Sequence, residues 1–410
     1  MGTIQKKQGE GERSSVARSI LLVALACVVF GVQQGIHDNY GIMMTGLLGP
    51  TGLSYSDISF CIGVGALIYG FAQPFMGMLA IRTSHRFVLI LGTVLMATGL
   101  LLTPLCRSFV TLLLCFGIVL PLGTTGLALG ILMSAITPII GERRAAAASG
   151  LVQAAAGIGD ALMSPTLESL ISSFGIQPAM SVFAIPLLLF IPIAIWIGAM
   201  SRRYTKPEEV EQVKNETMTS MIKGALKDRD YRLVTMAFAT CGFNMSIIES
   251  HLFSQFVSWG IPSQTASYIM TVYGIFTMIG ATATGFLCTR FRTNRVLGTV
   301  YAIRVVVSVA MLLLPKTVAL ALVTTALLGC SGDATVPPTT SVITKRFGAT
   351  RMAVLYGFAT VGHQIGAFFS SYLGGVFVDL GLGYAPLWIM NMCLATFAAA
   401  SSYRIGTQAK

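Results

Sequence analysis

Long apolar runs alternate with short polar connections along the 410 residues of the chain. A helix needs about 20 apolar residues to cross a hydrocarbon core of about 30 Å, and runs of that length recur between charged residues or Gly and Pro breaks. We place predicted membrane helices near residues 18–46, 56–81, 86–106, 109–139, 145–173, 178–200, 232–259, 264–289, 295–315, 317–344, 352–379 and 385–404. The pattern predicts an all-α membrane protein with twelve transmembrane helices.

The composition agrees with lipid as the surrounding solvent. Hydrophobic residues make up 54% of the chain and charged residues only 10%, whereas about 25% of a typical soluble domain is charged. These values exclude an ordinary water-soluble enzyme. The eight cysteines are scattered singly in apolar runs, without the paired spacing of a metal or redox site, so we expect no metal and no cofactor.

The net charge of +11 raises the question of a nucleic-acid partner, and the positions of the charges answer it. Lys and Arg gather in the short connections between apolar runs, not among aromatic residues on one polar face. All but Arg107, Lys316 and Arg304 fall on one side of the predicted topology, and an excess of Lys and Arg marks the cytoplasmic side. We expect no nucleic acid, and a bacterial inner membrane or plasma membrane with both termini in the cytoplasm.

A single long polar connection divides six predicted helices from six. The predicted order is a cytoplasmic tail at 1–17, a first six-helix bundle at 18–200, a cytoplasmic linker at 201–231, a second six-helix bundle at 232–404 and a tail at 405–410. Residues 218–226 of the linker form either an interfacial amphipathic helix or a mobile segment.

The two bundles are internal repeats. Gly31 and Asp38 recur 211 residues later as Gly242 and Glu249. Two further segments repeat at offsets of 207 and 208, with Gly77, Leu79 and Arg82 matched by Gly285, Leu287 and Arg290, and Gly141, Arg144, Gly150 and Gly159 matched by Gly348, Arg351, Gly357 and Gly366. Three segments at nearly one offset are hard to obtain by chance, so the sequence predicts two pseudo-symmetric six-helix bundles.

This organisation resembles the major facilitator superfamily over essentially the whole chain. The basis is six plus six helices, a long middle loop, and a Gly-x-x-x-(Asp)-Arg loop after the second helix and again after the eighth. Ile81 and Thr289 replace the usual acidic residue in the two copies, which leaves the family's salt bridge at that position without its carboxylate. The resemblance implies secondary transport, in which the two halves rock around a site near the middle of the membrane.

Three stretches are similar to the branch of the family that carries monocarboxylates, oxalate or formate. They run from Cys241 to His251, from Gly332 to Pro338 and from Gly357 to Gly366. The Gly-Pro signature that proton-coupled drug exporters have in the fifth helix is absent, since residues 157–165 read GIGDALMSP. The resemblance favours a small organic anion as the substrate.

The sequence contains no nucleotide-binding loop, dinucleotide-binding fingerprint or paired-His zinc motif. We therefore expect neither an enzyme nor an ATP-driven pump. The expected partners are the lipid bilayer and a small-molecule substrate, with H+ as coupling ion left open, and the protein is expected to act as a monomer.

Ionisable residues within a membrane helix cost several kcal/mol unless they are paired or face a cavity, so each is a functional candidate. His37 and Asp38 in the first helix, and Glu249 and His251 in the seventh, fall toward the outer half at about 1.5 Å of rise per residue. The family resemblance brings these two helices together at the outer gate. These four residues are candidates for proton coupling or gating; the alternative is that they are solvated at the outer mouth. Asp160 in the fifth helix is a further candidate, which either faces the cavity or bonds within the N-terminal half.

Polar residues at the middle of the membrane are candidates for substrate binding. His363 falls about 16 Å into the eleventh helix, where histidine either titrates or hydrogen-bonds a carboxylate; the alternative is a histidine bonded to a neighbouring helix. The full set of substrate-binding candidates is His363, Gln364, Gln33, Asn244, Gln153, Tyr356 and Arg304.

Arg304 and Asp333 fall at comparable depths in the ninth and tenth helices. We expect a structural ion pair between them, because each charge would neutralise the other and the ninth helix is peripheral in the family fold. The alternative is that Arg304 anchors an anionic substrate.

The sequence therefore predicts a secondary transporter that moves a small organic anion, such as a monocarboxylate, by alternating access. Proton symport through Asp38, Glu249 or His363 is left open. Two rival functions remain: an exporter of amphiphilic drugs or metabolites by proton antiport, and a membrane receptor or sensor that has lost transport.

Overall fold

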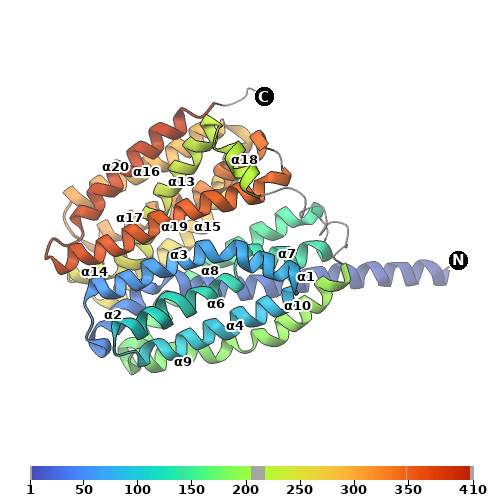
Figure 1. The fold of residues 1–410 in the computed structure, drawn as a ribbon, viewed down its shortest axis with the longest axis horizontal. Coiled ribbons are helices and arrows are strands. Elements are labelled where there is room, and N and C mark those ends of the chain that lie inside the picture. Colours follow the sequence, from blue (N-terminus) through green and yellow to red (C-terminus); the bar gives the residue numbers. More distant parts are fainter. Residues whose placement is uncertain (1, 141, 205–217, 348, 407–410) are drawn as a thin grey trace.

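The computed structural model describes residues 2–140, 142–204, 218–347 and 349–406, and every element in these ranges is a helix. The helices form an elongated bundle (Figure 1). The elements of the first half are α1 (Gly2–Asp38), α2 (Tyr40–Thr51), α3 (Tyr55–Arg82), α4 (His85–Leu102), η1 (Thr103–Leu105), α5 (Phe109–Leu112), η2 (Leu113–Val119), α6 (Leu120–Gly126), α7 (Leu129–Ile140), α8 (Glu142–Phe174), α9 (Ile176–Leu187) and α10 (Phe190–Tyr204). After α12 (Met218–Ala225), the second half has α13 (Arg229–Ser246), η3 (Ile247–Leu252), α14 (Phe253–Ser258), α15 (Ser263–Arg290), α16 (Thr293–Leu313), α17 (Val318–Ser331), η4 (Asp333–Thr335), α18 (Val336–Phe347), α19 (Ala349–Asp379) and α20 (Ala385–Tyr403).

The membrane spans agree with the predicted number. Ten segments of the described chain are long and apolar enough to cross a membrane, and that of α1 starts at Arg18. In addition, α8 and α19 have 33 and 31 residues, so at about 1.5 Å per residue each exceeds a hydrocarbon core of about 30 Å. Ten spans and these two helices are consistent with the twelve predicted from the sequence, and the all-α membrane architecture is confirmed.

Several membrane helices are broken where the sequence suggested one continuous run. The first is interrupted at Asn39, whose Nδ2 donates a 2.7 Å hydrogen bond to O of Gly35. The fourth contains the π-helical segment η2 and ends its α6 part at Gly126, and the tenth is broken at Gly332. Irregular backbone inside a membrane is tolerated only where it is buried in protein or lines a cavity. These breaks therefore point to the positions around which the site is built.

The linker prediction is tested in part. Of its two alternatives for residues 218–226, the helix is the one observed, as α12. Residues 205–217 of the linker lie outside the described ranges, as do Gly141 and Gly348 of the predicted repeat.

Glycines of the predicted repeat form the helix crossings inside each half. In the first half, a Cβ atom on Gly159 of α8 would lie 1.8 Å from O of Gly31 in α1. In the second half, a Cβ on Gly242 of α13 would lie 1.7 Å from O of His363 in α19. The first and fifth helices thus cross as the seventh and eleventh do, through glycines that the repeat pairs, and this supports the two-bundle organisation.

The two halves pack along two pairs of helices, α3 with α19 and α8 with α15; the first pair lies side by side in Figure 1. Glycine again permits close approach, because a Cβ on Gly157 of α8 would lie 2.6 Å from O of Gly274 in α15. Small residues at such crossings let membrane helices associate through van der Waals contact. Any site between the halves is therefore tightly enclosed.

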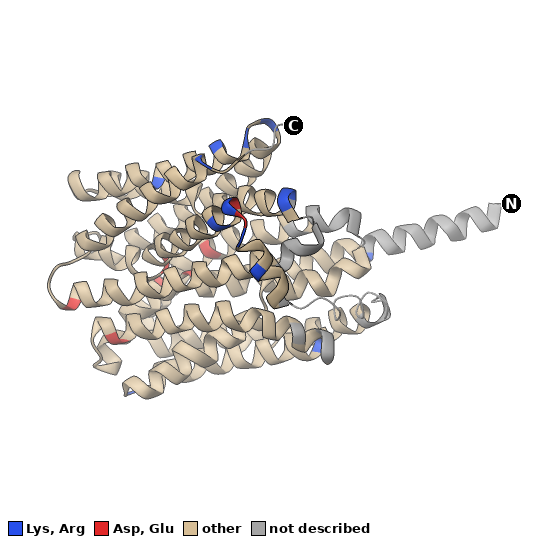
Figure 2. Ribbon diagram, turned by 45° about the horizontal axis from the view of Figure 1, so that its top comes forward, with Lys and Arg blue, Asp and Glu red and all other residues tan. Residues whose placement is uncertain are grey.

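Lys and Arg residues of the described chain gather at one end of the bundle, where the chain leaves α20 (Figure 2). We call this the basic end; its connections include Arg86, Arg290, Arg292 and Arg404. We call the other end, with the connections at 52–54, 259–262 and 380–384, the opposite end.

Gly159→Ala should destabilise the protein, because its Cβ would overlap O of Gly31 and push α8 away from α1. Overpacking of this kind costs about 1–3 kcal/mol, so we expect a lower thermal unfolding midpoint for the purified protein in detergent. Gly150→Ala on the same helix is the matched control, since nothing lies within 4 Å of a Cβ at that position. An unchanged midpoint for Gly159→Ala would mean that these two backbones are not in contact.

Candidate functional site

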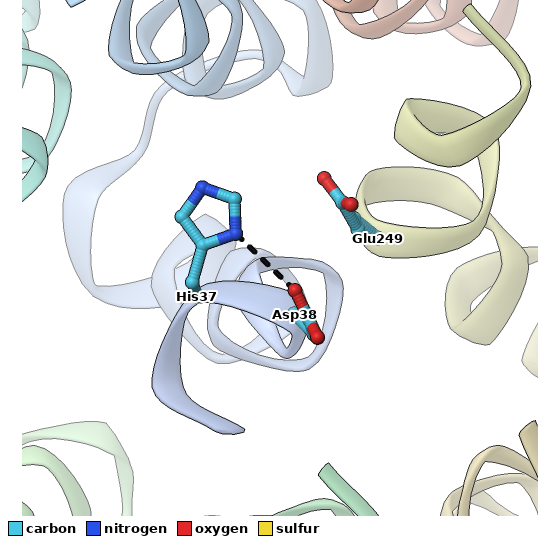
Figure 3. Close-up of side chains that lie close together, drawn as sticks. All are labelled: His37, Asp38 and Glu249. Carbon is cyan, nitrogen blue, oxygen red and sulfur yellow. Dashed lines mark hydrogen bonds and ion pairs between the residues drawn. The ribbon is translucent and has the colours of Figure 1, made fainter. Parts of the chain in front are cut away.

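Three titratable side chains from the two halves lie close together (Figure 3). They belong to His37, Asp38 and Glu249. His37 and Asp38 end α1, and Glu249 lies in η3. Nδ1 of His37 is 3.2 Å from Oδ1 of Asp38, and the side chain of Glu249 extends into the space between the two helices (Figure 3). One potential ligand atom from each of the three lies within 4.8 Å of the others. Residues that the sequence marked separately as proton-coupling or gating candidates thus form one cluster.

Irregular backbone on both sides positions this cluster. Glu249 lies in a π-helical segment, and such segments are frequent at functional sites. The break at Asn39 ends α1 directly after Asp38. Beyond it, a Cβ on Gly41 would be 2.8 Å from O of Glu249, so α2 passes close to η3 only because position 41 has no side chain.

The spacing of the three side chains bears on whether the cluster could hold a metal ion. Two ligands on one ion, at bond lengths near 2.1 Å, lie roughly 3–3.5 Å apart, which is closer than the spread of up to 4.8 Å found here. Oδ1 of Asp38 is also engaged by Nε2 of Gln34, which donates a 2.7 Å hydrogen bond to it. No second group of three or more such residues comes together in the described part of the chain.

Asp160 is buried where α8 crosses α15, with 1% of its surface exposed. Its Oδ1 accepts a 3.0 Å hydrogen bond from Nδ2 of Asn39, and the hydroxyl of Ser164 donates to Oδ1 of Asn39 at 2.6 Å. Oδ2 of Asp160 has no hydrogen-bond partner within the described ranges, and a Cβ on Gly274 would lie 2.9 Å from it. A buried oxygen without a partner is costly, so this carboxyl faces the other half with capacity for a proton or a ligand.

A small cavity lies between the halves beside these residues. Its lining includes Asp38 and Asp160 from the first half and Tyr273 and Asp333 from the second. At about 20 Å³ it has room for roughly one water molecule. The halves thus lie close together here, although 15% of the Asp38 side chain remains exposed. The lining contains no Lys or Arg. With Glu249 nearby, each half contributes two carboxyls to the interface.

Hydrogen bonds join the two halves at the opposite end. Nε2 of His251 donates to O of Ser371 at 2.9 Å, and its Nδ1 lies 3.1 Å from the hydroxyl of Tyr55 in the first half. The hydroxyl of Tyr384 donates to that of Tyr55 at 3.3 Å, and the hydroxyl of Ser371 donates to O of Ser59 at 2.7 Å. His251 is fully buried with both ring nitrogens engaged, so it lies apart from the Glu249 cluster and connects the halves instead.

Two of the predicted substrate-binding residues lie at the interface. Nε2 of Gln153 donates a 3.2 Å hydrogen bond to Oδ2 of Asp333 across it. Gln364 packs over Gly70 where α19 crosses α3, so closely that a Cβ on Gly70 would be 2.6 Å from Cγ of Gln364. Only the first of these contacts borders the cavity.

The other candidates lie within the halves. His363 and Tyr356 pack on Phe238, with ring centroids 4.9 and 5.5 Å away. Asn244 donates a 3.3 Å hydrogen bond to a side chain of α20. Gln33 is fully buried, and neither of its amide atoms has a partner in the described chain. The predicted substrate-binding set therefore does not form a single site in this conformation.

The predicted ion pair between Arg304 and Asp333 is wrong. Arg304 is fully buried in the second half, and its Nη2 donates to O of Ser331 at 2.5 Å and to O of Gly332 at 3.0 Å. Asp333 faces the cavity instead. The break in the tenth helix exposes the carbonyls of Ser331 and Gly332, and both accept hydrogen bonds from the guanidinium. Arg304 is not part of the cavity lining, so it is not placed to anchor a substrate there.

Two contributors to the site were missed by sequence reasoning. Ser164 follows Asp160 by one helical turn, so its spacing was a usable signal for a shared face. Tyr55 begins α3 beside a polar connection, and nothing in its surroundings distinguishes it from an ordinary interface tyrosine.

A known family matches most of this chain. The profile of the Major Facilitator Superfamily aligns with residues 15–371 and 252–405. The chain belongs to the Major Facilitator Superfamily. As a member of this superfamily it is an integral membrane transporter, which agrees with the expectation that it is not an enzyme.

Relatives within the superfamily are distant. "MFS-type transporter 1" of Ophiocordyceps sp. (strain BCC 1869) is 23% identical, over 85% of this chain and 76% of that protein. "Uncharacterized MFS-type transporter YcxA" of Bacillus subtilis (strain 168) is 21% identical over 91% of each. "Monocarboxylate transporter 11" of Mus musculus is 23% identical over 65% of this chain and 58% of that protein.

Solved structures of superfamily members share the fold. A D-xylose-proton symporter superposes with a TM-score of 0.73 at 15% identity, covering 95% of this chain and 98% of that one. A bacterial homologue of the human lysosomal transporter Spinster, in an inward-facing and unoccupied conformation, gives 0.68 at 16% identity over 94% of each. At such identities the likeness establishes the fold alone.

Tyr55→Phe should loosen the opposite end, because it removes the hydroxyl that contacts His251 and Tyr384. One lost hydrogen bond shifts an equilibrium by about 1 kcal/mol, or roughly 5-fold. We expect amide hydrogen exchange of residues 55–59 to accelerate by that factor, as measured by mass spectrometry. Tyr268→Phe, at a site in α15 that is 58% exposed, is the control. Equal exchange in the two variants would show that the Tyr55 hydroxyl does not hold this end closed.

Proposed function

We propose that this protein is a secondary active transporter that moves a small organic anion together with protons by alternating access. The observation that carries the proposal is the meeting of four carboxyls between the halves. Asp38 and Asp160 come from the first half, and Asp333 and Glu249 from the second. Transporters built from repeats place substrate and coupling-ion sites at such an interface, near the middle of the membrane.

Charge repulsion links proton binding to the movement of the halves. With the halves packed around a cavity for about one water, carboxylates from opposite halves approach where little water is available to screen them, so like charges repel. Bound protons remove this repulsion. A protonated interface therefore favours closure, and a charged interface favours opening to water. His37, 3.2 Å from Asp38, is placed to exchange a proton with that carboxyl.

An anion can enter this site only after protons have bound. No Lys or Arg lines the cavity, and Arg304 is held by two carbonyls away from it. A carboxylate would otherwise meet up to four like charges, so its transport requires protons. The printed name of one relative, "Monocarboxylate transporter 11", supports a monocarboxylate as the substrate. In this proposal the basic end faces the cytoplasm, and one chain contains the complete site.

A second candidate function is proton antiport of a cationic solute. The observation that favours it is the same set of carboxyls without a lining cation, because a cation would bind the deprotonated site directly and compete with protons. The two functions differ in the sign of their pH dependence. Lower pH strengthens the binding of an anion carried with protons, whereas it weakens the binding of a cation exchanged for them.

Short monocarboxylates should bind more tightly as the pH falls. We expect lactate or pyruvate to raise the thermal unfolding midpoint of the purified protein more at about pH 5.5 than at about pH 7.5, since ligand binding stabilises the native state by mass action. Coupling between two ligands is typically about 1–3 kcal/mol, or roughly 5- to 150-fold in affinity. Exchange of radiolabelled lactate in proteoliposomes should follow the same pH dependence.

Asp38→Asn and Glu249→Gln should each remove most of this pH dependence. Glu168→Gln is the matched control, because Glu168 is also buried on α8, with 5% exposed, but does not line the cavity. Stabilisation by lipophilic cations alone, weakening at low pH, would favour the antiport function. Carboxylate binding of equal strength at both pH values in the unaltered protein would contradict proton symport.

A further inference from the structure

The tenth membrane helix is broken beside the cavity. The helix α17 ends at Ser331, Gly332 adopts a ψ of −95°, and η4 follows before α18 begins. Asp333 opens η4 and lines the cavity between the halves. Its Oδ2 accepts a 3.2 Å hydrogen bond from Nε2 of Gln153 in the first half. The direction of this carboxyl therefore depends on the geometry of the break.

Arg304 of α16 holds the free end of α17. Its Nη2 donates to O of Ser331 at 2.5 Å and to O of Gly332 at 3.0 Å. The last carbonyls of a helix have no intrahelical donor and carry partial negative charge, so a guanidinium there satisfies both needs. Cζ of Arg304 also lies 5.3 Å from the ring centroid of Tyr301, which stabilises the cation further.

The internal repeat shows that the fold itself does not require a cation at this position. In the first half the matching helix is also broken, between Gly126 and Leu129. At the repeat offset of 207 to 211, Arg304 corresponds to residues 93–97, whose sequence TVLMA contains no charge. The buried arginine is thus specific to the half that places a carboxyl, Asp333, at its break.

We propose that Arg304 is a positioning residue for Asp333. By holding the two carbonyls at the break, it directs this carboxyl toward Gln153 and so stabilises the closed contact between the halves. The part played by Asp333 in coupling rests on the proposed function, whereas the contact itself needs no substrate. Without Arg304 the break is free to move, the bond to Gln153 is lost, and the halves separate more readily.

Arg304→Met tests this proposal, because Met96 lies within the matching segment of the first half. The measurement is hydrogen-exchange mass spectrometry of the full chain in detergent. We expect this variant to exchange about 10-fold faster at residues 55–59 of the opposite end, since a factor of this order corresponds to the free energy of one hydrogen bond to a charged group. Gln153→Ala, which removes the other partner of the contact without changing the charge of the cavity, should have the same effect. The double variant should show no more than either single variant, because both act through one contact.

Arg107→Met is the matched control. Arg107 also donates to two backbone carbonyls, each at 3.0 Å, but it does not line the cavity, so its loss should leave residues 55–59 unchanged. Additive effects of the Arg304 and Gln153 substitutions, or faster exchange confined to residues 331–335, would mean that Arg304 only stabilises its own half and would overturn the proposal.

If the Arg304→Met protein does not fold, a second substitution of the same residue still tests the proposal. Arg304→Lys keeps the charge, but its side chain is shorter than the one whose Nη2 reaches both carbonyls, and the proposal expects it to accelerate exchange of residues 55–59 in the same direction. Unchanged exchange in folded Arg304→Lys, together with the expected effect of Gln153→Ala, would also overturn it. Because no substrate is used, failure of monocarboxylate binding would count against the proposed function and leave this result unaffected.

Discussion

Direct contact between helix backbones is the constraint on which the rest of this structure depends. At Gly159 against Gly31, at Gly242 against His363, and between Gly157 and Gly274, a side chain of even one carbon would collide with a neighbouring carbonyl. Lipid supplies no hydrophobic force between helices, so such close packing has to hold them together. The same closeness leaves almost no space between the halves. Carboxyls placed there are consequently brought together whether or not they carry protons, and this makes the packing sensitive to charge.

Contacts between the halves are of two chemical kinds, hydrogen bonds at the opposite end and carboxyls around the cavity. The first depend on geometry and the second on charge. At the opposite end, Tyr55, His251 and Ser371 form short hydrogen bonds that depend on geometry. Around the cavity, the contacts involve the carboxyls of Asp38 and Asp333, whose charge the proposed function links to the position of the halves. A carrier needs one set of contacts that holds its halves together in the same geometry each time, and another whose strength depends on what is bound at the site. Arg304 connects the two, because it stabilises the backbone break from which Asp333 reaches the first half.

Much of the fold could be predicted because the internal repeat includes the glycines at which the helices cross. Gly31 and Gly242 mark crossings that recur in both halves, and charged residues are so rare in the apolar runs that His37, Asp38 and Glu249 were conspicuous. Their partners were less accessible, because helical phase within an apolar run is poorly determined. A π-helical turn contains more residues than an α-helical turn, so η3 shifts that phase and separates His251 from Glu249. Nothing in the sequence reveals the free carbonyls that bind Arg304, and the expected ion pair failed for that reason.

The small size of the central cavity has a consequence for energy conservation. A membrane potential contributes about 2.3 kcal/mol per elementary charge for each 100 mV, and an uninterrupted file of water across the protein would dissipate it. A space of about 20 Å³ holds roughly one molecule, which leaves little room for such a file at the level of the carboxyls. The packing that holds the two halves together therefore also narrows any path by which water and ions could leak through the protein.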